Sequence, residues 1–572
     1  MDYLAHIINM VLIFTMLASS LNLILGYGGM ATMCHAALFG IGGYASAILT
    51  MNLGCNFLVG TILAALLSGF IGVLLASPSL RIQDEYLILF TTAFQMVIWG
   101  LMVSEVWITN GETGLSAIPR ASVFGIQFLK PISYIPLIAA LAALFFLICW
   151  KVSHSPFGRV LRCIREDELS TRSIGKNVLR FKVLTFMVGG AIAGGAGSIL
   201  AHYNAYINPV SFNLDASILM IAMVVLGGST NMFGSVVGSL LLVGIPEMLR
   251  FVPGTATLIA PLRNAIFGSL LIFFILFRPQ GLIPEHVGRL RVRRTPLPKL
   301  PEEEILTLSE QEGPAKSQGV SEPVIEVKGI RKSFGGIQAV NSFSMSLSPG
   351  KITTLIGPNG CGKTTVFNLI SGFISPDEGS IYLRGKDVTN RQPHELVQLG
   401  LVRSWQDVRI FRNMSVLDNV MAAIPDQIGE RLFAIFFRPR RVRQEEWKNT
   451  RMALAYLEFV GLAEKAYELA GELSFAEQKQ LSLARLIATR GSILLFDEPA
   501  SGMDVVSTKN IQKMILRLAG FGKTICVVEH NLDLVKELSD ESLFMNQGDV
   551  IRKAKPEELM TDPQLALVYF GG

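Results

Sequence analysis

The sequence is poor in charge, and the shortage falls on one half of the chain. Of its 572 residues, 17% are charged, against about 25% in typical soluble domains. Charged residues are sparse up to about residue 280 and ordinary afterwards. This distribution excludes a protein that is soluble throughout. The net charge of +5 is modest, and it gives no indication of nucleic-acid binding.

Cysteine pairs are also missing. The six cysteines are scattered and none forms a CxxC pair, which excludes a disulfide framework and a zinc site of the usual spacing. The N-terminus lacks a basic region followed by a small-residue cleavage site. We therefore expect no removable signal peptide and interpret the first apolar segment as a retained transmembrane helix.

Long apolar segments take up the first half of the chain. They reach or approach the roughly 20 residues that span the hydrocarbon of a bilayer, at residues 7–26, 30–53, 57–76, 86–102, 132–150, 183–202 and 262–277. So many uncharged segments in succession are not typical of buried helices in a soluble protein. We predict an all-α, polytopic transmembrane permease domain over residues 1–285.

Lysine and arginine set the expected orientation. The basic residues of the loop 151–182 place it in the cytoplasm. Five crossings before it then put the N-terminus outside, Arg81 on the inner side and residues 103–131 outside. The same loop mixes acids with bases at residues 165–168. This mixture favours docking onto a soluble domain over a loop that only sets topology.

The segment 215–247 is harder to place. Two short apolar runs flank a glycine-rich stretch at residues 227–235, and the region must contribute zero or two crossings for the chain to end in the cytoplasm. Interrupted helices persist at membrane depth only where the freed backbone lines a cavity or packs in protein. Residues 227–235 are therefore a candidate part of the transport pathway. A loop between two short tilted helices is the alternative.

The second half changes character. Residues 286–322 carry several prolines followed by a Glu/Ser/Gln/Gly-rich stretch, which indicates a flexible tether. From residue 323 to 572, short β-rich runs alternate with helical patterns. This alternation predicts an α/β domain.

A phosphate-binding loop is the most specific motif. Residues 357–365 follow an expected strand at 351–356 and open an expected helix at 363–371. Such a turn directs backbone N–H groups at phosphate oxygens, while the lysine reaches the β- and γ-phosphates and the next hydroxyl binds Mg²⁺. The nucleotide-binding candidates are Gly357, Pro358, Asn359, Gly360, Cys361, Gly362, Lys363, Thr364 and Thr365.

Further polar residues fit the same site. A buried strand ends in Asp497, suited to hold Mg²⁺ through water, and Glu498, suited to polarise the attacking water. Gln406 suits both Mg²⁺ and that water, and His530, after the expected strand 524–528, suits the γ-phosphate. Phe334 is a candidate to stack on adenine. Taken singly, Phe334 also fits a core residue and His530 a helix cap. The catalytic candidates are Glu498, His530 and Gln406, and the metal candidates are Thr364, Gln406 and Asp497.

The order of these motifs resembles an ABC-transporter ATPase. In this chain, residues 334–340 (FGGIQAV) and 403–406 (RSWQ) are similar to the ATPases of branched-chain amino acid importers. The first half resembles the permease of the same systems at residues 21–30 (LNLILGYGGM), 165–168 (REDE), 225–228 (VLGG) and 278–282 (RPQGL). Because importers of this type usually keep permease and ATPase on separate chains, the sequence resembles a natural fusion.

The resemblance implies an ATP hydrolase that drives solute import across the bacterial inner membrane, with ATP and Mg²⁺ as cofactors. It implies three partners: a second permease subunit, a second ABC ATPase subunit and an extracytoplasmic solute-binding protein. Branched-chain or related small amino acids are the implied substrates, and urea or an amide is the alternative. An ABC exporter is disfavoured by the short cytoplasmic loops.

One motif departs from the family pattern. The family's signature motif is Leu-Ser-Gly-Gly-Gln, whereas the signature of this chain, residues 473–477, reads LSFAE. In the family, this segment faces the γ-phosphate of ATP held by the opposing subunit, so Ser474 and Ala476 are nucleotide-binding candidates. Ala476 adds a Cβ where backbone approaches phosphate, and Glu477 adds negative charge unless it faces away. We expect a weakened composite site and a hetero-oligomer with an ATPase of intact signature. A weakly hydrolytic regulatory subunit is the alternative.

Overall fold

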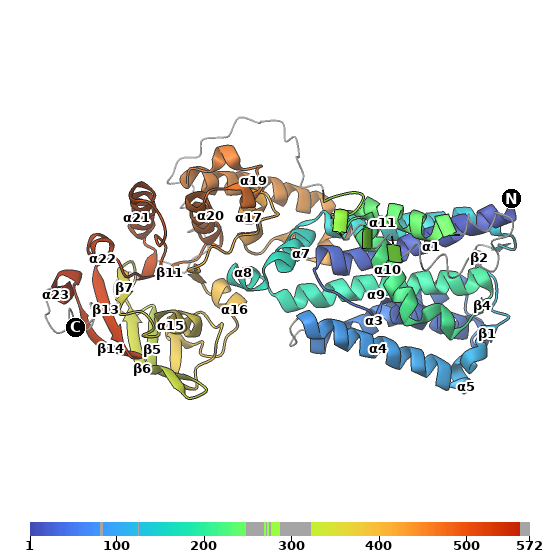
Figure 1. The fold of residues 1–572 in the computed structure, drawn as a ribbon, viewed down its shortest axis with the longest axis horizontal. Coiled ribbons are helices and arrows are strands. Elements are labelled where there is room, and N and C mark those ends of the chain that lie inside the picture. Colours follow the sequence, from blue (N-terminus) through green and yellow to red (C-terminus); the bar gives the residue numbers. More distant parts are fainter. Residues whose placement is uncertain are drawn as a thin grey trace. The chain divides into compact units, whose positions relative to one another are not determined.

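The computed structural model describes residues 1–79, 84–123, 125–246, 268–269, 272–273, 276–278, 280–285 and 322–560. The chain forms two compact units (Figure 1). Unit 1 comprises Met1–Arg165, Val178–His286 and Arg431–Phe437, and unit 2 comprises Glu166–Asn177, Val287–Glu430 and Arg438–Gly572. Each unit therefore takes one short segment from the other's part of the sequence. Arg81 and most of the expected segments 262–277 and 286–322 lie outside the described residues.

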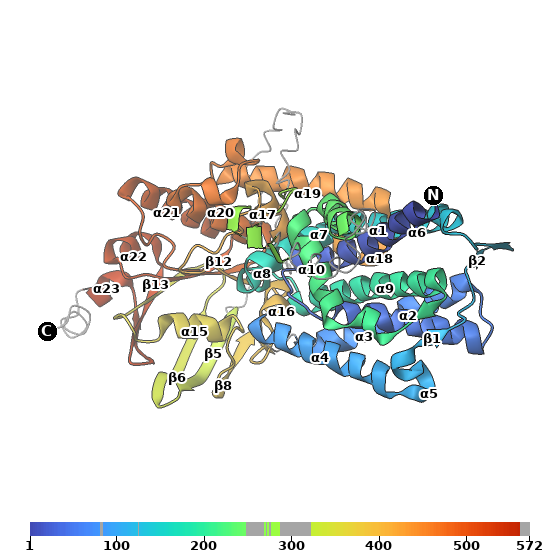
Figure 2. The same cartoon turned by 45° about the vertical axis from the view of Figure 1, so that its right-hand side comes forward.

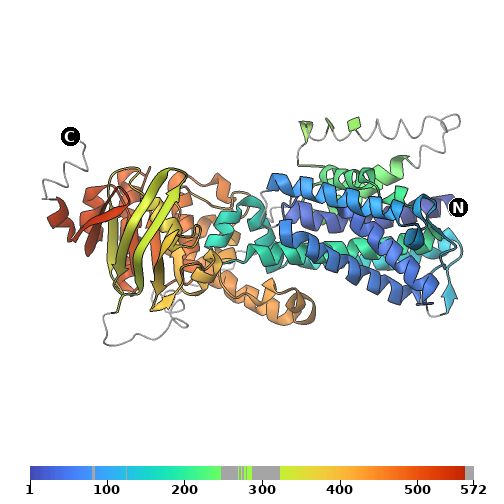
Figure 3. The same cartoon turned by 90° about the horizontal axis from the view of Figure 1, so that it is seen from below.

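Unit 1 is helical, as its apolar segments predict. Its long helices are α1 (Asp2–Asn22), α2 (His35–Asn52), α3 (Phe57–Ser79), α4 (Asp84–Ser104), α6 (Pro131–Ser153) and α9 (Val178–Asn204). Figure 3 shows the long helices of this unit running side by side. Among the described residues, five helices are long and apolar enough to cross a membrane: Asp2–Tyr27, Phe57–Ser77, Tyr86–Ser104, Pro131–Ser153 and Val178–Asn204.

Small residues let the helices around α9 approach closely. A Cβ at Gly42 of α2 would lie 2.2 Å from the Cα of Gly194, and one at Gly197 would lie 2.0 Å from the carbonyl oxygen of Phe39. Contacts this close exclude any side chain. They provide the van der Waals packing that stabilises helix pairs in lipid, where no hydrophobic driving force exists.

The expected outer segment 103–131 folds into short elements. These are α5 (Val106–Thr109), β1 (Leu115–Ser116), β2 (Ser122–Val123) and β3 (Ile126–Gln127). Strand β1 pairs with β4 (Tyr206–Ile207), which follows α9 directly.

The region 215–247 forms two short helices, α10 (Leu214–Gly227) and α11 (Met232–Ser239), joined by a tight turn. Asn22, fully buried at the end of α1, holds this turn. Its side chain accepts a hydrogen bond from the N–H of Thr230 at 3.0 Å and donates to the carbonyl of Asn231 and to Ser235 Oγ, both at 2.9 Å. The interrupted backbone is thus satisfied by protein groups. Its arrangement across the membrane stays a prediction.

Unit 2 is α/β, as its alternating pattern predicts. One sheet has the order β10-β11-β12-β7-β13-β14, with parallel neighbours except for the antiparallel pair β13–β14. A second, antiparallel sheet has the order β6-β5-β8-β9. The strands of the first sheet are β7 (Ile352–Ile356), β10 (Leu401–Arg403), β11 (Ile493–Asp497), β12 (Thr524–Val528), β13 (Glu541–Asn546) and β14 (Asp549–Ala554). Those of the second are β5 (Ile325–Phe334), β6 (Ile337–Leu347), β8 (Glu378–Leu383) and β9 (Lys386–Asp387).

Helices flank the sheets of unit 2 (Figure 2). They are α15 (Lys363–Ile370), α16 (Pro393–Gln398), α17 (Val416–Ala423), α19 (Pro439–Phe459), α20 (Phe475–Ala488), α21 (Val505–Gly520), α22 (Leu532–Leu538) and α23 (Pro556–Met560). Helix α7 (Pro156–Glu166) leads into the exchanged helix α8 (Glu168–Ser173) of unit 2, and α18 (Leu432–Phe437) is the exchanged helix of unit 1.

Candidate nucleotide site

The phosphate loop connects the predicted strand and helix, β7 and α15. All five residues of β7 are buried, so the loop emerges from a fixed point of the sheet. Gly362 has φ +104°, and a Cβ there would lie 2.3 Å from the carbonyl oxygen of Ala339, so only glycine fits. Lys363 donates from Nζ to the carbonyls of Gly357 at 2.8 Å and Pro358 at 2.9 Å. Its ammonium group therefore lies within the curve of the loop.

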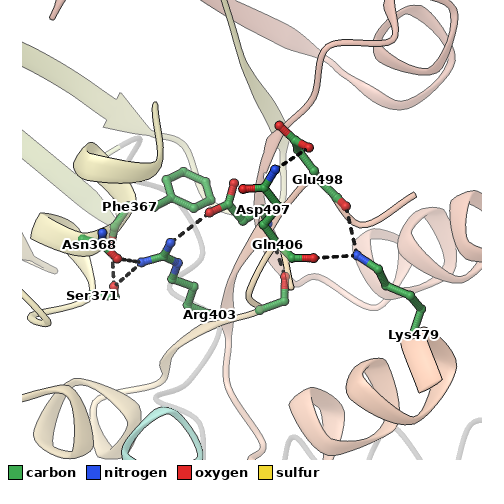
Figure 4. Close-up of polar contacts among 9 residues, drawn as sticks. Phe367, Asn368, Ser371, Arg403, Gln406, Lys479, Asp497 and Glu498 are labelled. Atoms are coloured by element: carbon green, nitrogen blue, oxygen red, sulfur yellow. Dashed lines mark hydrogen bonds and ion pairs between the residues drawn. The ribbon is translucent and has the colours of Figure 1, made fainter. Parts of the chain in front are cut away.

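The three catalytic candidates converge at the carboxyl end of the parallel strands, where α/β proteins bind ligands. Gln406 follows β10, Glu498 follows β11 and His530 follows β12. Gln406 donates from Nε2 to Glu498 Oε2 at 2.9 Å (Figure 4). His530 Nδ1 lies 3.8 Å from Glu498 Oε1. Glu498 has φ +47°, an unusual conformation for a side-chain-bearing residue that is common at functional sites.

Arg403 is a member of the site whose role the motif search missed. Its guanidinium donates to Asp497 Oδ2 at 2.9 Å, and both side chains are only 1% exposed. It also donates to Asn368 and Ser371, at the end of the helix that follows the phosphate loop (Figure 4). Arg403 therefore joins that helix to the carboxylate expected to hold the metal. Burial raises the pKa of Asp497, and the neighbouring guanidinium opposes this rise.

Lys479 is the second cation that sequence reasoning missed. It lies on α20, is buried, and donates from Nζ to the backbone carbonyl of Gln406 at 2.9 Å and of Glu498 at 3.4 Å (Figure 4). Burial lowers the pKa of Lys479, and the Glu498 carboxylate opposes that change. The sequence does not predict this contact, because it depends on how α20 packs beside β11 and not on the position of Lys479 after the signature.

The residues expected to bind Mg²⁺ suit a hard cation that prefers oxygen ligands. Asp497 Oδ1 is buried and has no hydrogen-bond partner among the described residues, so it is available to a metal-bound water. The Thr364 hydroxyl belongs to the first turn of α15. No group of three or more His, Cys, Asp or Glu side chains in the described part of the chain has metal-binding spacing. Such a group is not needed where one carboxylate and substrate phosphates hold the ion.

The altered signature forms a closed capping arrangement. Ser474 is the N-cap of α20, and its N–H (3.0 Å) and Oγ (2.9 Å) both donate to Glu477 Oε2. Lys465 donates from Nζ to Glu477 Oε1 at 2.6 Å and thereby lowers the pKa of Glu477. The added negative charge is thus paired. However, it occupies both donors of Ser474 that the composite site would need.

The structure also decides two alternatives. The core interpretation of Phe334 is wrong, because the ring lies at the tip of the β5–β6 hairpin and is 48% exposed. The helix-cap interpretation of His530 is wrong, because Asn531 is the N-cap of α22. The nucleotide contacts of both side chains stay predictions.

Within the loop 151–182, which is expected to dock onto the soluble domain, residues 166–177 belong to unit 2. Asp167 pairs with Arg409 at 2.8 Å, and Ser170 Oγ donates to the Arg409 carbonyl at 2.7 Å. Lys176 pairs with Glu430 at 2.5 Å in a largely buried contact. The docking prediction is therefore confirmed, and the charges of this segment have specific partners.

A stack of aromatic and cationic groups connects residues 166–177 with the catalytic edge, which is the carboxyl end of the parallel strands where Gln406, Glu498 and His530 lie. The Trp405 ring has the Arg403 guanidinium 4.7 Å from its centroid and that of Arg409 at 5.2 Å. Because Arg403 pairs with Asp497 and Arg409 pairs with Asp167, the contacts are continuous. Cation–π contacts of this kind are stronger when desolvated, and Trp405 Nε1 is buried.

Comparison with known proteins agrees with both units. A family model described as the branched-chain amino acid transport system permease component matches residues 3–275, and an ABC transporter model matches residues 340–501. The high-affinity branched-chain amino acid transport ATP-binding protein LivG of Escherichia coli K12 is 36% identical over 253 residues, which are 44% of this chain and 99% of that protein. BraF of Pseudomonas aeruginosa, described in the same words, is 34% identical over the same shares. A nucleotide-free ATP-binding cassette from an ABC transporter, a solved structure, is 31% identical, with a TM-score of 0.39 over 44% of this chain and 100% of that one.

Proposed function

Because the chain belongs to the ABC transporter family of the branched-chain amino acid transport systems, we propose that it imports branched-chain or related small amino acids across the bacterial inner membrane. The family's activity is ATP hydrolysis coupled to transport, and both the permease and the ATP-binding regions lie on this polypeptide. The substrate class rests on the permease match and on the names of the ATP-binding relatives. Urea or a short amide is the alternative solute.

The observation that carries the proposal is the docked segment. Residues 166–177 lie in sequence between the spanning helices α6 and α9, yet they fold as part of the ATPase unit. Because the chain joins this segment covalently to α6 and α9, motion of the ATPase unit would pull on both helices. We place the permease domain at residues 1–285, the tether at 286–322 and the ATPase domain at 323–572.

At the nucleotide site, each residue has a separate task. Backbone N–H groups of the loop 357–365, apart from Pro358, which has none, and the Lys363 ammonium bind the phosphates, and Phe334 stacks on the base. The Glu498 carboxylate orients and polarises the attacking water, and Gln406 and His530 fix its position and that of the γ-phosphate. Asp497, Thr364 and Gln406 would hold Mg²⁺, which would neutralise charge on the phosphates.

The stack at Trp405 is the proposed link between hydrolysis and transport. Gln406 is the next residue in the chain, so a backbone shift that moves Gln406 toward or away from the nucleotide would also displace Trp405. The indole in turn contacts Arg409, which pairs with Asp167 of the docked segment. These contacts form a continuous route from Trp405 to the docked segment, and a kinetic test measures the coupling along it.

Reconstituted vesicles provide that test. With a second permease, a second ATPase and a solute-binding protein present, the wild type should take up leucine only with ATP. Trp405→Ala should retain ATP turnover within a few-fold and lose most uptake, while Trp405→Phe keeps an aromatic ring between the arginines and should retain both. Uptake by Trp405→Ala in step with its ATP turnover would contradict the coupling role. Nucleotide-independent uptake by the wild type would contradict the function itself.

A weakly hydrolytic regulatory subunit is the second candidate. It is favoured by the contact of Glu477 with both donors of Ser474. It is disfavoured by the convergence of Gln406, Glu498 and His530, which a non-catalytic subunit does not need. Replacement of Glu498 separates the two, because only a hydrolytic subunit depends on that carboxylate.

A further inference from the structure

Helix α18 belongs to the membrane unit although its sequence, LFAIFF, lies in the ATPase half. Its inner face is apolar and packed. Ala434 and Ile435 are buried, and Ile435 joins the core of unit 1 together with partly buried Leu432 and Phe436. The helix contacts α6 (Figure 2), where Lys151 Nζ lies 5.9 Å from the centroid of the Phe436 ring.

The outer face of α18 is also apolar. Phe433 and Phe437 are 64% and 70% exposed, and their rings stack with centroids 4.4 Å apart. A spacing of four residues puts both rings on one side of the helix. A helix that is apolar all round is not typical of a water-exposed surface. We therefore expect the face with Phe433 and Phe437 to contact an apolar environment.

Next to α18, helix α6 presents an exposed apolar stripe, which is typical of the lipid-facing side of a membrane-spanning helix. Leu144 and Leu147 of α6 are exposed, and Lys151 continues the same stripe one turn later. Lysine at the end of a spanning helix reaches towards the interface while its stem stays in apolar surroundings. Because Lys151 contacts Phe436, α18 lies beside the end of this exposed stripe.

The charges around α18 complement a phospholipid surface. Arg431 precedes the helix, and the exposed arginines that follow it are Arg438, Arg440, Arg441 and Arg443. The cytoplasmic leaflet is anionic and attracts basic residues with about 1 kcal/mol each near the surface. Aromatic rings beside basic residues are the composition of helices that lie in the membrane interface.

We propose that α18 is an interfacial membrane anchor, with Phe433 and Phe437 inserted among the lipids of the cytoplasmic leaflet and the flanking arginines on anionic headgroups. The ATPase half thereby contributes a lipid contact of its own. A second protein subunit covering the same rings is the competing occupant. Lipid is favoured because α18 lies beside an exposed apolar stripe of α6 and because the exposed charged residues next to it in sequence, Arg431, Arg438, Arg440 and Arg441, are all basic.

Spin-label accessibility on the full-length protein tests the proposal directly. A nitroxide attached at Phe433→Cys, in vesicles with about a third of anionic lipid, should collide more with lipid-soluble oxygen than with a water-soluble nickel chelate. A label at Val505→Cys provides the matched control, because Val505 is an equally exposed apolar residue of unit 2, and it should show the reverse. Protein without either introduced cysteine gives the background from the native thiols.

The outcomes separate lipid from protein and from water. Oxygen preference at position 433 that weakens in purely zwitterionic vesicles supports the anchor. Preference for the nickel chelate overturns the anchor, because the label then faces water. Protection of the label from both reagents that appears only when a second permease subunit is added also overturns it, because a protein then covers the rings. As a functional arm, the Phe433→Ser/Phe437→Ser variant should lose roughly threefold or more of ATP-driven uptake in anionic vesicles. The Val505→Ser/Val506→Ser control should keep wild-type uptake, and equal uptake by both double variants would contradict the anchor.

Discussion

The carboxyl edge of the parallel strands and the N-terminus of α20 arrange their polar groups in opposite ways. At the strand edge, Glu498 accepts a hydrogen bond from Gln406, and one buried oxygen of Asp497 has no hydrogen-bond partner within the described part of the chain, so the groups are positioned for a ligand. At α20, both donors of Ser474 are already satisfied by Glu477, whose charge is paired with Lys465. The strand edge (the catalytic end) therefore presents polar groups to a phosphate ligand, whereas the donors at the N-terminus of α20 (the closed end) are satisfied within the chain.

This difference has a consequence for assembly. In the family, each nucleotide lies between the phosphate loop of one ATPase and the signature of another. Paired with itself, this chain would place the closed signature at both sites. Paired with an ATPase of intact signature, it would provide its own catalytic edge to one favourable site. The contrast therefore supports the expected hetero-oligomer.

The largest effect is expected at the catalytic edge. Glu498→Gln preserves the side-chain shape but removes the carboxylate that polarises water, so ATP turnover should fall by about 10²–10⁴-fold and uptake should fall with it. ATP binding should persist. The measurements are phosphate release, uptake and nucleotide binding on the same preparation. If turnover and uptake stay near wild type, the regulatory interpretation replaces the hydrolytic one.

Alkylation of Cys361 should affect the same end through the phosphate loop. The thiol is buried, with its sulfur 3.9 Å from Lys363 Nζ, and an added group must displace loop atoms at a cost of about 1–3 kcal/mol. We expect at least about a tenfold loss of ATP affinity, with protection by bound ATP. Burial raises the pKa of Cys361, so less thiolate is present near neutrality and the rate of alkylation should increase as the pH rises. Cys361→Ala is the control, and unchanged turnover after complete modification would contradict the prediction.

The sequence was sufficient for the elements that local patterns determine. Strand β7, the loop and α15 follow from the GPNGCGKTT pattern and its flanking β-rich and helical runs, and the long apolar segments predicted the helices of unit 1. Gln406, Glu498 and His530 could be predicted to meet because each follows a strand of one parallel sheet. The motif order provided that information without any tertiary contact.

The cations of the site could not be found in this way. Arg403 meets Asp497 only because β10 pairs with β11 in a register that sets Arg403 opposite Leu495, and Lys479 reaches Gln406 only through the packing of α20. The sequence also does not predict that α18 belongs to unit 1, because a run of six apolar residues is equally typical of a core helix of the ATPase domain. Tertiary pairing decides these contacts, and no local pattern encodes it.

A smaller effect on the catalytic edge is expected from its buried ion pair. Arg403→Met leaves Asp497 as an unpaired buried carboxylate, and breaking such a pair costs about 3–5 kcal/mol. We expect a clear drop in thermal stability, and a higher Mg²⁺ requirement for turnover because Asp497 is no longer held in place. Arg391→Met is the matched control, because Arg391 pairs with Glu395 on the surface, where ion pairs contribute little. Equal stability of the two variants would show that the buried pair has no special role.

The smallest expected effect is a gain at the closed end. Glu477→Gln keeps an acceptor for the Ser474 N–H but removes the charge that competes with phosphate for the N-terminus of α20, a competition worth about 0.3–1 kcal/mol. For the chain paired with itself, ATP turnover should rise by roughly threefold. The rise should be smaller with a partner ATPase, since its intact signature would then serve this chain's phosphate loop. Lys465→Met should have the opposite effect, because it leaves the Glu477 charge uncompensated near the incoming phosphate. If neither variant changes turnover with either pairing, the carboxylate does not restrain the composite site, and the contrast between the two ends loses its functional meaning.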